Sequence, residues 1–109
     1  MELSGWRVMW LIVCFDLPTL TPGEKKEYVR FRKALLDDGF DMMQYSVYMR
    51  CCPSEENAAV HSGRVRGALP PDGKVNIVRI TDRQFGRIEV YLGKKRKKTP
   101  EKVEQLQFF

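Results

Sequence analysis

The chain has 109 residues, a formal net charge of +5 and a pI of about 9.3, with 43% hydrophobic and 30% charged residues. This length predicts a single domain, and this composition excludes a disordered chain. The longest apolar run, residues 8–15, is far shorter than the roughly 20 residues of a membrane-spanning helix. We therefore expect a cytoplasmic protein without membrane contact, and the basic balance favours nucleic acid or another polyanion as the partner.

Residues 6–15 are predicted to form the first strand, because both of its alternating sets of side chains are apolar. A strand of this kind is covered on both faces. The two predicted helices would cover one face. In so short a chain, a second copy of the protein is a good candidate for the other face, so we expect a homodimer.

The next segment reads as a helix that ends near Gly39, with Thr21 and Glu24 spaced as a capping box. Its apolar side chains recur at positions i, i+3 and i+7, which indicates a face turned to the core. These residues are Tyr28, Phe31 and Leu35.

The remaining elements are predicted from alternation, caps and turns: a strand over residues 40–52, a helix from 54 to about 69, and strands over 74–81 and 85–92. The order is β-α-β-α-β-β, or β-α-β-β-α-β if residues 40–52 split into two strands. Either order predicts an α+β fold, a small antiparallel sheet with two helices on one face and an interface on the other.

Cysteine and histidine give little sign of a metal site. The three cysteines are Cys14, Cys51 and Cys52, with no C-x-x-C spacing, and the single histidine has no cysteine near it in sequence. Reduced thiols are the simpler interpretation, and a structural zinc site is not expected. We expect His61 on the solvent-facing side of its helix.

Asp16 ends the predicted first strand and has two interpretations. A carboxylate at a strand end can ligate Mg²⁺ together with waters and substrate phosphates. Alternatively, it hydrogen-bonds the backbone of the turn that it opens. One carboxylate in each chain is too few for a hydrolase, whereas two copies related by a two-fold axis would supply two.

Two basic segments are candidates for phosphate contacts, which give affinity without sequence readout. The first lies on the predicted first helix and comprises Lys25, Lys26, Arg30, Arg32 and Lys33. The second is a continuous run of Lys94, Lys95, Arg96, Lys97 and Lys98. The alternatives are a solvated helix face and a solubilising tail. For Phe40, Tyr45 and Tyr48 we favour packing in the core or in a dimer over stacking on bases.

Several segments together resemble one known family. They are Phe15–Pro18, the basic helix, Gly39–Phe40 followed by Gln44–Tyr48, and the closing Gln105–Phe109. The chain looks like the small CRISPR-associated adaptation protein of the ferredoxin-like endoribonuclease family, the partner of the CRISPR integrase. The resemblance covers nearly the whole chain.

The resemblance implies a ferredoxin-like β-α-β-β-α-β sandwich over residues 1–93, followed by a basic segment and a C-terminal strand, 94–109, exchanged within a sheet-to-sheet homodimer. It implies a protein that bridges integrase dimers and holds duplex DNA during spacer acquisition. It also implies a Mg²⁺-dependent endonuclease activity in some members, on RNA or DNA, with Asp16 at the position of the metal ligand and the ion shared across the dimer. Arg30 and Arg32 fall on the helix that is basic in the family.

Three hypotheses follow. The first is a dimeric adaptation subunit, in which catalysis by Asp16 is secondary. The second is a stand-alone metal-dependent endoribonuclease of toxin type on the same fold. The third is a nucleic-acid-binding module without an integrase partner.

Overall fold

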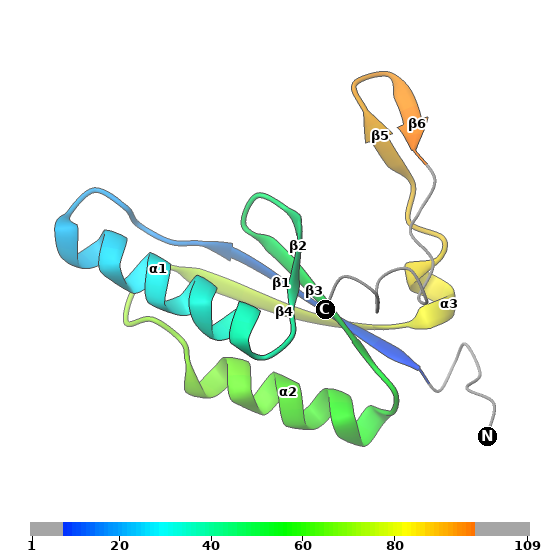
Figure 1. Ribbon diagram of the computed structural model, residues 1–109, viewed down its shortest axis with the longest axis horizontal. Coiled ribbons are helices and arrows are strands. Elements are labelled where there is room, and N and C mark those ends of the chain that lie inside the picture. The colour runs from blue at the N-terminus through cyan, green and yellow to red at the C-terminus, as the bar shows by residue number, and fades with distance from the viewer. Residues whose placement is uncertain (1–7, 98–109) are drawn as a thin grey trace.

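The protein is described by a computed structural model that places residues 8–97 (Figure 1). A β-α-β-β-α-β unit is followed by a short helix and a hairpin, which confirms the second of the two predicted element orders. The elements are β1 (Met9–Asp16), α1 (Pro22–Asp37), β2 (Asp41–Gln44), β3 (Val47–Cys52), α2 (Glu55–Gly67), β4 (Lys74–Thr81), α3 (Asp82–Phe85), β5 (Val90–Leu92) and β6 (Lys95–Lys97).

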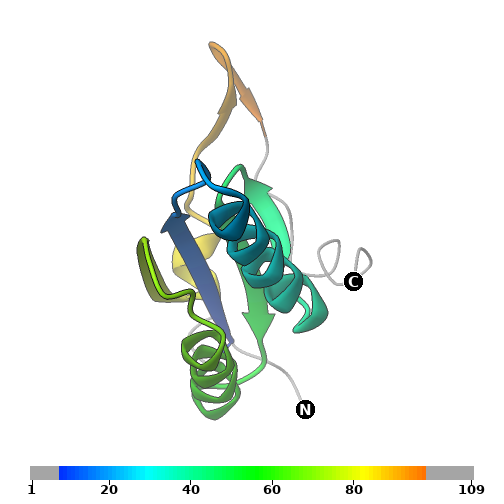
Figure 2. The ribbon, with the colours of Figure 1, turned by 90° about the vertical axis from the view of Figure 1, so that its left-hand side faces the viewer.

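The main sheet has four antiparallel strands in the order β2-β3-β1-β4. β1 is therefore central and hydrogen-bonded along both of its edges. The helices α1 and α2 lie on one face of this sheet and share a core with it (Figure 2). The predicted α+β class, with its antiparallel sheet and two helices on one face, is confirmed.

Local signals set the ends of α1 as predicted. The Thr21 hydroxyl accepts a hydrogen bond from the Glu24 N–H at 3.1 Å, and the Glu24 carboxylate accepts one from the Thr21 N–H at 2.9 Å. This reciprocal capping box satisfies two N–H groups that the helix leaves without partners. Beyond the C-terminal end of α1, Gly39 adopts φ +86°, a conformation in which glycine avoids the strain of a side chain.

Residues 40–52 form two strands and not one, because the chain turns at Tyr45 and Ser46. Gln44 pairs with Val47 across this turn, and Ser46 adopts φ +61°. Two-residue hairpin turns usually carry glycine or asparagine at such positions. The sequence therefore lacks the usual signal, and its alternation continues through the turn.

The main core lies between the sheet and the two helices. The side chains of β1 that face the helices are fully or almost fully buried, and they pack against Phe31 and Leu35 of α1. The predicted core face of α1 is thus confirmed, with Tyr28 partly buried at its edge. The β1 residues in this core are Met9, Leu11, Val13 and Phe15.

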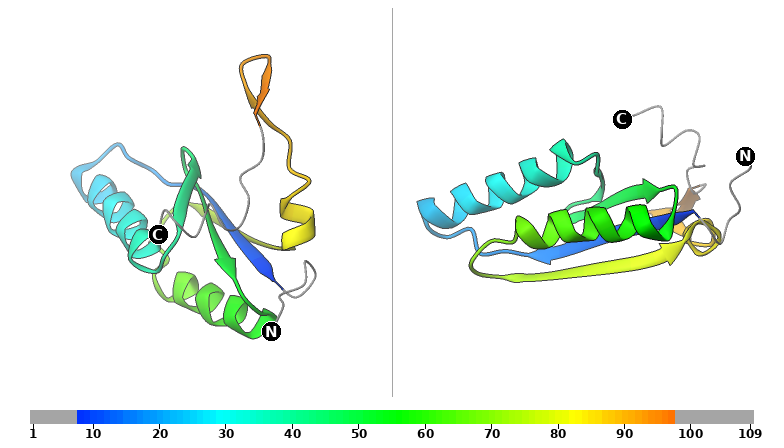
Figure 3. Two further views of the ribbon diagram at one scale, coloured as in Figure 1. Left: turned by 45° about the vertical axis from the view of Figure 1, so that its right-hand side comes forward. Right: turned by 90° about the horizontal axis from the view of Figure 1, so that it is seen from below.

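The opposite face of β1 is partly covered by the chain itself. The rings of Trp10 and Phe85 are stacked with centroids 3.8 Å apart and planes 6° from parallel. The Trp10 Nε1–H donates to Asp82 Oδ1 at 2.7 Å, and the Asp82 N–H donates to Val8 O at 2.8 Å. The short helix α3 therefore covers the first half of this face, and that half does not need a second copy (Figure 3). This corrects part of the reasoning that led us to expect a dimer.

The predicted strand over residues 85–92 is wrong in its first half. A second capping box, between Thr81 and Gln84, begins a helical turn directly after β4, and Phe85 ends that turn as a buried residue. Strand structure starts only at Val90, where β5 pairs with β6 in a separate hairpin. This hairpin spans the predicted domain boundary at residue 93, and the division into 1–93 and 94–109 stays a prediction. Trp6 and the closing segment 105–109 lie outside the described residues.

Phe85→Ala tests the cover that α3 gives to Trp10. Removing a fully buried phenylalanine opens a cavity, so we expect a loss of about 3–5 kcal/mol in the free energy of unfolding, measured by urea denaturation. Leu92→Ala is the matched control: Leu92 is 66% exposed, and its truncation should cost less than about 0.5 kcal/mol. Equal losses in the two variants would show that α3 does not cover Trp10.

Candidate nucleic-acid interface and carboxylate site

Asp16 is the last residue of β1, and its side chain is exposed. In the sheet register it lies opposite Lys74, the first residue of β4. A shallow depression of about 230 Å³ opens here. It is lined by Cys14, Phe15, Asp16, Tyr45, Ser46, Val47, Lys74 and Asn76.

Backbone contacts fix the position of Asp16 within this depression. The Phe15 N–H donates to Ser46 O at 3.0 Å, which joins the β2–β3 turn to the end of β1. On the other side Gly73 adopts φ +96°, and a Cβ there would lie 2.8 Å from Asp16 O and 2.7 Å from Leu17 Cδ2. Because only glycine combines this φ with this close approach, the turn before β4 can pack against the main chain of Asp16.

The residues around Asp16 can hold a divalent cation only in part. Mg²⁺ prefers one or two protein oxygens and keeps several waters, and the Ser46 hydroxyl and Asn76 amide line the same depression. The Lys74 ammonium, however, works against a cation. Within residues 8–97 no three His, Cys, Asp or Glu side chains gather to hold a metal ion. Asp16 is the one carboxylate that lines the depression.

Internal contacts already engage three of the predicted basic residues of α1. Arg30 forms an ion pair with Glu27 at 2.8 Å and also donates to the Ala68 carbonyl at 3.0 Å. The Arg32 Nε–H donates to the Tyr48 hydroxyl at 2.7 Å, and Lys33 pairs with Asp37 at 2.7 Å. These side chains help to hold the fold, so phosphate would compete with internal partners for them.

The other predicted basic residues have no side-chain partner among the described residues, and all of them are exposed. They fall into two groups: the first turns of α1 and the β5–β6 hairpin. The hairpin projects away from the main sheet (Figure 1), so its cations are accessible from several sides. The exposed basic residues of the two groups are Lys25 and Lys26 on α1, and Lys94, Lys95, Arg96 and Lys97 on the hairpin. Lys98 lies outside the described residues.

The three aromatic residues that we expected to pack divide into two kinds. Phe40 and Tyr48 are buried in the core, which confirms packing for them. Tyr45 sits in the β2–β3 turn with 78% of its surface exposed, so core packing is wrong for this residue, and its packing in a dimer stays a prediction. The reason is the turn itself, which breaks the alternation that had placed Tyr45 on a strand.

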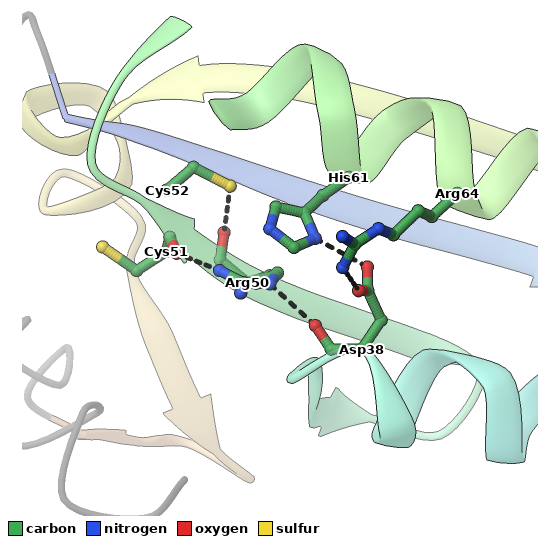
Figure 4. A network of polar contacts seen from close by, with 6 residues as sticks. All are labelled: Asp38, Arg50, Cys51, Cys52, His61 and Arg64. Carbon is green, nitrogen blue, oxygen red and sulfur yellow. Dashed lines mark hydrogen bonds and ion pairs between the residues drawn. The ribbon is translucent and has the colours of Figure 1, made fainter. Parts of the chain in front are cut away.

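A polar network missed by the sequence reasoning joins the end of α1 to α2 (Figure 4). His61 Nδ1 lies 2.7 Å from Asp38 Oδ2, and Arg64 donates to Asp38 Oδ1 at 2.7 Å. His61 is buried, so its expected solvent-facing position is wrong: the ring points from α2 towards the Asp38 carboxylate at the C-terminal end of α1. The spacing of Asp38 and His61 gives no local signal of this contact.

The same network reaches β3 through Arg50. Its Nε–H donates to the Asp38 carbonyl at 2.8 Å, and another guanidinium N–H donates to the Cys51 carbonyl at 2.8 Å. The neighbouring Cys52 is fully buried, and this desolvation raises the pKa of its thiol. The network therefore fastens α1, α2 and β3 to one another, and it lies apart from the Asp16 depression.

Comparison with known proteins gives consistent matches. A family model described as "CRISPR associated protein Cas2" matches residues 9–88. The chain is similar to the "CRISPR-associated endoribonuclease Cas2" of Parvibaculum lavamentivorans, with 58% identity over 93% of this chain and 100% of the relative. Proteins with the same description from Flavobacterium psychrophilum and Paracidovorax avenae are 50% and 42% identical, over 99% and 98% of this chain and 94% and 99% of their own lengths.

No helix within residues 8–97 has the length and apolar character to span a membrane.

Asp38→Ala tests the polar network. It would leave the buried His61 without its partner, so we expect a loss of about 2–3 kcal/mol in the free energy of unfolding, measured by urea denaturation. The neighbouring Asp37→Ala removes an exposed ion pair with Lys33 and should cost no more than about 1 kcal/mol. If the network does not stabilise the fold, the two variants will lose similar amounts of unfolding free energy.

Proposed function

Because the chain belongs to the CRISPR-associated Cas2 family, we propose that it acts in CRISPR adaptation as a dimeric subunit that binds the backbone of duplex DNA and bridges integrase dimers during spacer acquisition. The family match supports this role over most of the chain. The near full-length agreement with the relatives supports the same domain organisation.

The observation that carries the proposal is the set of exposed cations without internal partners, on the first turns of α1 and on the β5–β6 hairpin. Cations that no internal carboxylate neutralises are free to replace the counterions of a nucleic acid. Contacts of this kind to phosphate hold a duplex in place irrespective of its sequence. An adaptation protein needs this property, because the DNA fragments that it handles differ in sequence.

The outer half of β1 supports the dimer. Ile12 and Cys14 lie beyond the cover of α3 and are only partly buried, and Val78 on the neighbouring strand is 41% exposed. Their register places all three on the face of the sheet opposite α1 and α2. A second copy packed on this face would bury them and bring two Asp16 carboxylates into one assembly.

The second candidate function is a Mg²⁺-dependent endonuclease, which includes the stand-alone endoribonuclease of toxin type. Its support is the exposed Asp16 at the depression and the word "endoribonuclease" in the descriptions of the relatives. A bound Mg²⁺ would stabilise the charge that develops on the scissile phosphate. Asp16 from each copy would hold the ion, and Lys74 would attract the phosphate backbone.

Replacement of the three cations of β6 tests backbone binding. We expect the affinity of the protein for a duplex to fall steeply as salt rises, and Lys95→Ala/Arg96→Ala/Lys97→Ala to weaken binding at low salt. The slope of log K against log [salt] should become shallower by about 0.9 for each phosphate that the variant no longer neutralises. Fluorescence anisotropy across a salt series measures both quantities.

Arg79→Ala is the control for this series, because Arg79 on β4 is held by Glu55 and its replacement should leave the slope unchanged. A flat salt response of the wild-type protein would contradict backbone binding. An unchanged slope in the triple variant would remove the hairpin from the interface.

Asp16→Ala separates the two candidate functions. We expect duplex binding and spacer acquisition to persist, because an exposed carboxylate contributes no attraction to phosphate. Any Mg²⁺-dependent cleavage by the wild-type protein should disappear, as it should with EDTA. Acquisition in cells and cleavage of labelled RNA and DNA are the measurements, with the exposed Asp72→Ala as a control. Loss of acquisition while dimer and complex still form would contradict the scaffolding role.

A further inference from the structure

The most exposed aromatic side chain of the described residues lies beside the candidate site. Tyr45 is 78% exposed and lines the same depression as Asp16 and Lys74. We propose that Tyr45 is a stacking platform for an unpaired base whose phosphodiester lies in this depression. The ligand class is thus a nucleic acid with at least one unpaired nucleotide, at a single strand or at the end of a duplex. This inference rests on the proposed nucleic-acid function and assigns a residue and a substrate feature to it.

A ladder of aromatic rings holds Tyr45 in place. Its ring is stacked on that of Tyr28, with centroids 6.5 Å apart and planes 25° from parallel. Tyr28 in turn meets Phe15 edge to face at 5.9 Å, and Phe15 belongs to the buried core. An exposed tyrosine is ordinarily free to rotate, whereas this one is supported from the core outward. A base that stacks on it meets a side chain that is already oriented.

The turn that carries Tyr45 is tied to the end of β1. Ser46 has a left-handed backbone, φ +61°, that residues other than glycine seldom adopt, and its carbonyl accepts the hydrogen bond from the Phe15 N–H. The residue after Tyr45 is thereby tied to the residue before Asp16. Backbone conformations of this kind tend to occur where a protein positions a functional side chain.

Charge and chemistry at the site suit a nucleotide. The Lys74 ammonium, in register opposite Asp16, can attract a phosphate, and the Tyr45 phenol is neutral at physiological pH, as an ordinary tyrosine is. Hydrogen bonding with Tyr28 raises the pKa of Tyr45 further. A neutral ring does not repel the phosphate chain. Stacking on an aromatic side chain needs a base with a free face, and the interior bases of a duplex have none. The platform therefore selects unpaired nucleotides, with little preference among the bases.

Binding measured in EDTA isolates this role from any metal-dependent cleavage. The probes are two DNA duplexes of equal length: one blunt, and one with a short single-stranded overhang that carries 2-aminopurine. We expect Tyr45→Ala to bind the overhang probe roughly tenfold more weakly and to lose the quenching of 2-aminopurine. Binding of the blunt probe should not change.

Two further substitutions separate stacking from other effects of the change. Tyr45→Phe keeps the ring and should retain both affinity and quenching, whereas Tyr45→Leu keeps apolar area without a ring and should behave as Tyr45→Ala. Met42→Ala alters a side chain of the same hairpin that is 54% exposed, and it should match the wild type. Thermal unfolding of each variant confirms that the fold is retained.

The outcomes distinguish this inference from the proposed function. Salt-dependent binding of the blunt probe with no effect of Tyr45→Ala on the overhang probe overturns the stacking role alone. The same holds if Tyr45→Ala weakens both probes equally, or if it lowers the dimer mass, because Tyr45 would then serve a protein contact. Failure of the wild-type protein to bind either probe overturns the proposed function and this inference with it.

Discussion

The central strand β1 is hydrogen-bonded to a neighbour along both edges, packed against the helices on one face and covered by α3 over the first half of the other face. Once such a strand is formed, the rest of the chain has few arrangements left, because every other strand must lie beside it or beyond its neighbours. β1 therefore fixes where its last residue lies: Asp16 stands at the end of this central strand, where two turns meet it. Gly73 lets one turn pack against the main chain of Asp16, and Ser46 lets the other return to the Phe15 N–H.

The basic residues differ in whether the fold supplies an acceptor for their side chains. Where a cation has an internal acceptor, as Arg30 has Glu27 and the Ala68 carbonyl, it contributes to holding α1 in place. Where it has none, as on the β5–β6 hairpin, its charge is available to a partner. The net charge of +5 is therefore unevenly distributed over the molecule. Much of the positive charge that has no internal partner lies on the β5–β6 hairpin.

The sequence by itself determined the elements whose signals are local. The capping box of Thr21, the glycine stop at Gly39 and the periodicities of β1 and α1 follow from dihedral preferences and burial, which act over a few residues. The position of Asp16 at a strand end follows from the same stretch, and the family resemblance follows from this stretch together with Gly39–Phe40, Gln44–Tyr48 and Gln105–Phe109. The sequence did not predict the turn at Ser46, because no glycine marks it. It also did not predict the cover of Trp10 by Phe85, because these two residues are 75 positions apart in the chain.

Only the tertiary structure decided which side chains meet. It paired His61 with Asp38 in a buried contact, and it joined Arg30 to the Ala68 carbonyl and Arg32 to the Tyr48 hydroxyl. It also brought Tyr45 to the rim of the Asp16 depression, supported by Tyr28. The physical reason is one of range: local sequence fixes the direction of the backbone, whereas the partner of a polar or aromatic group depends on packing between elements that are distant in the chain.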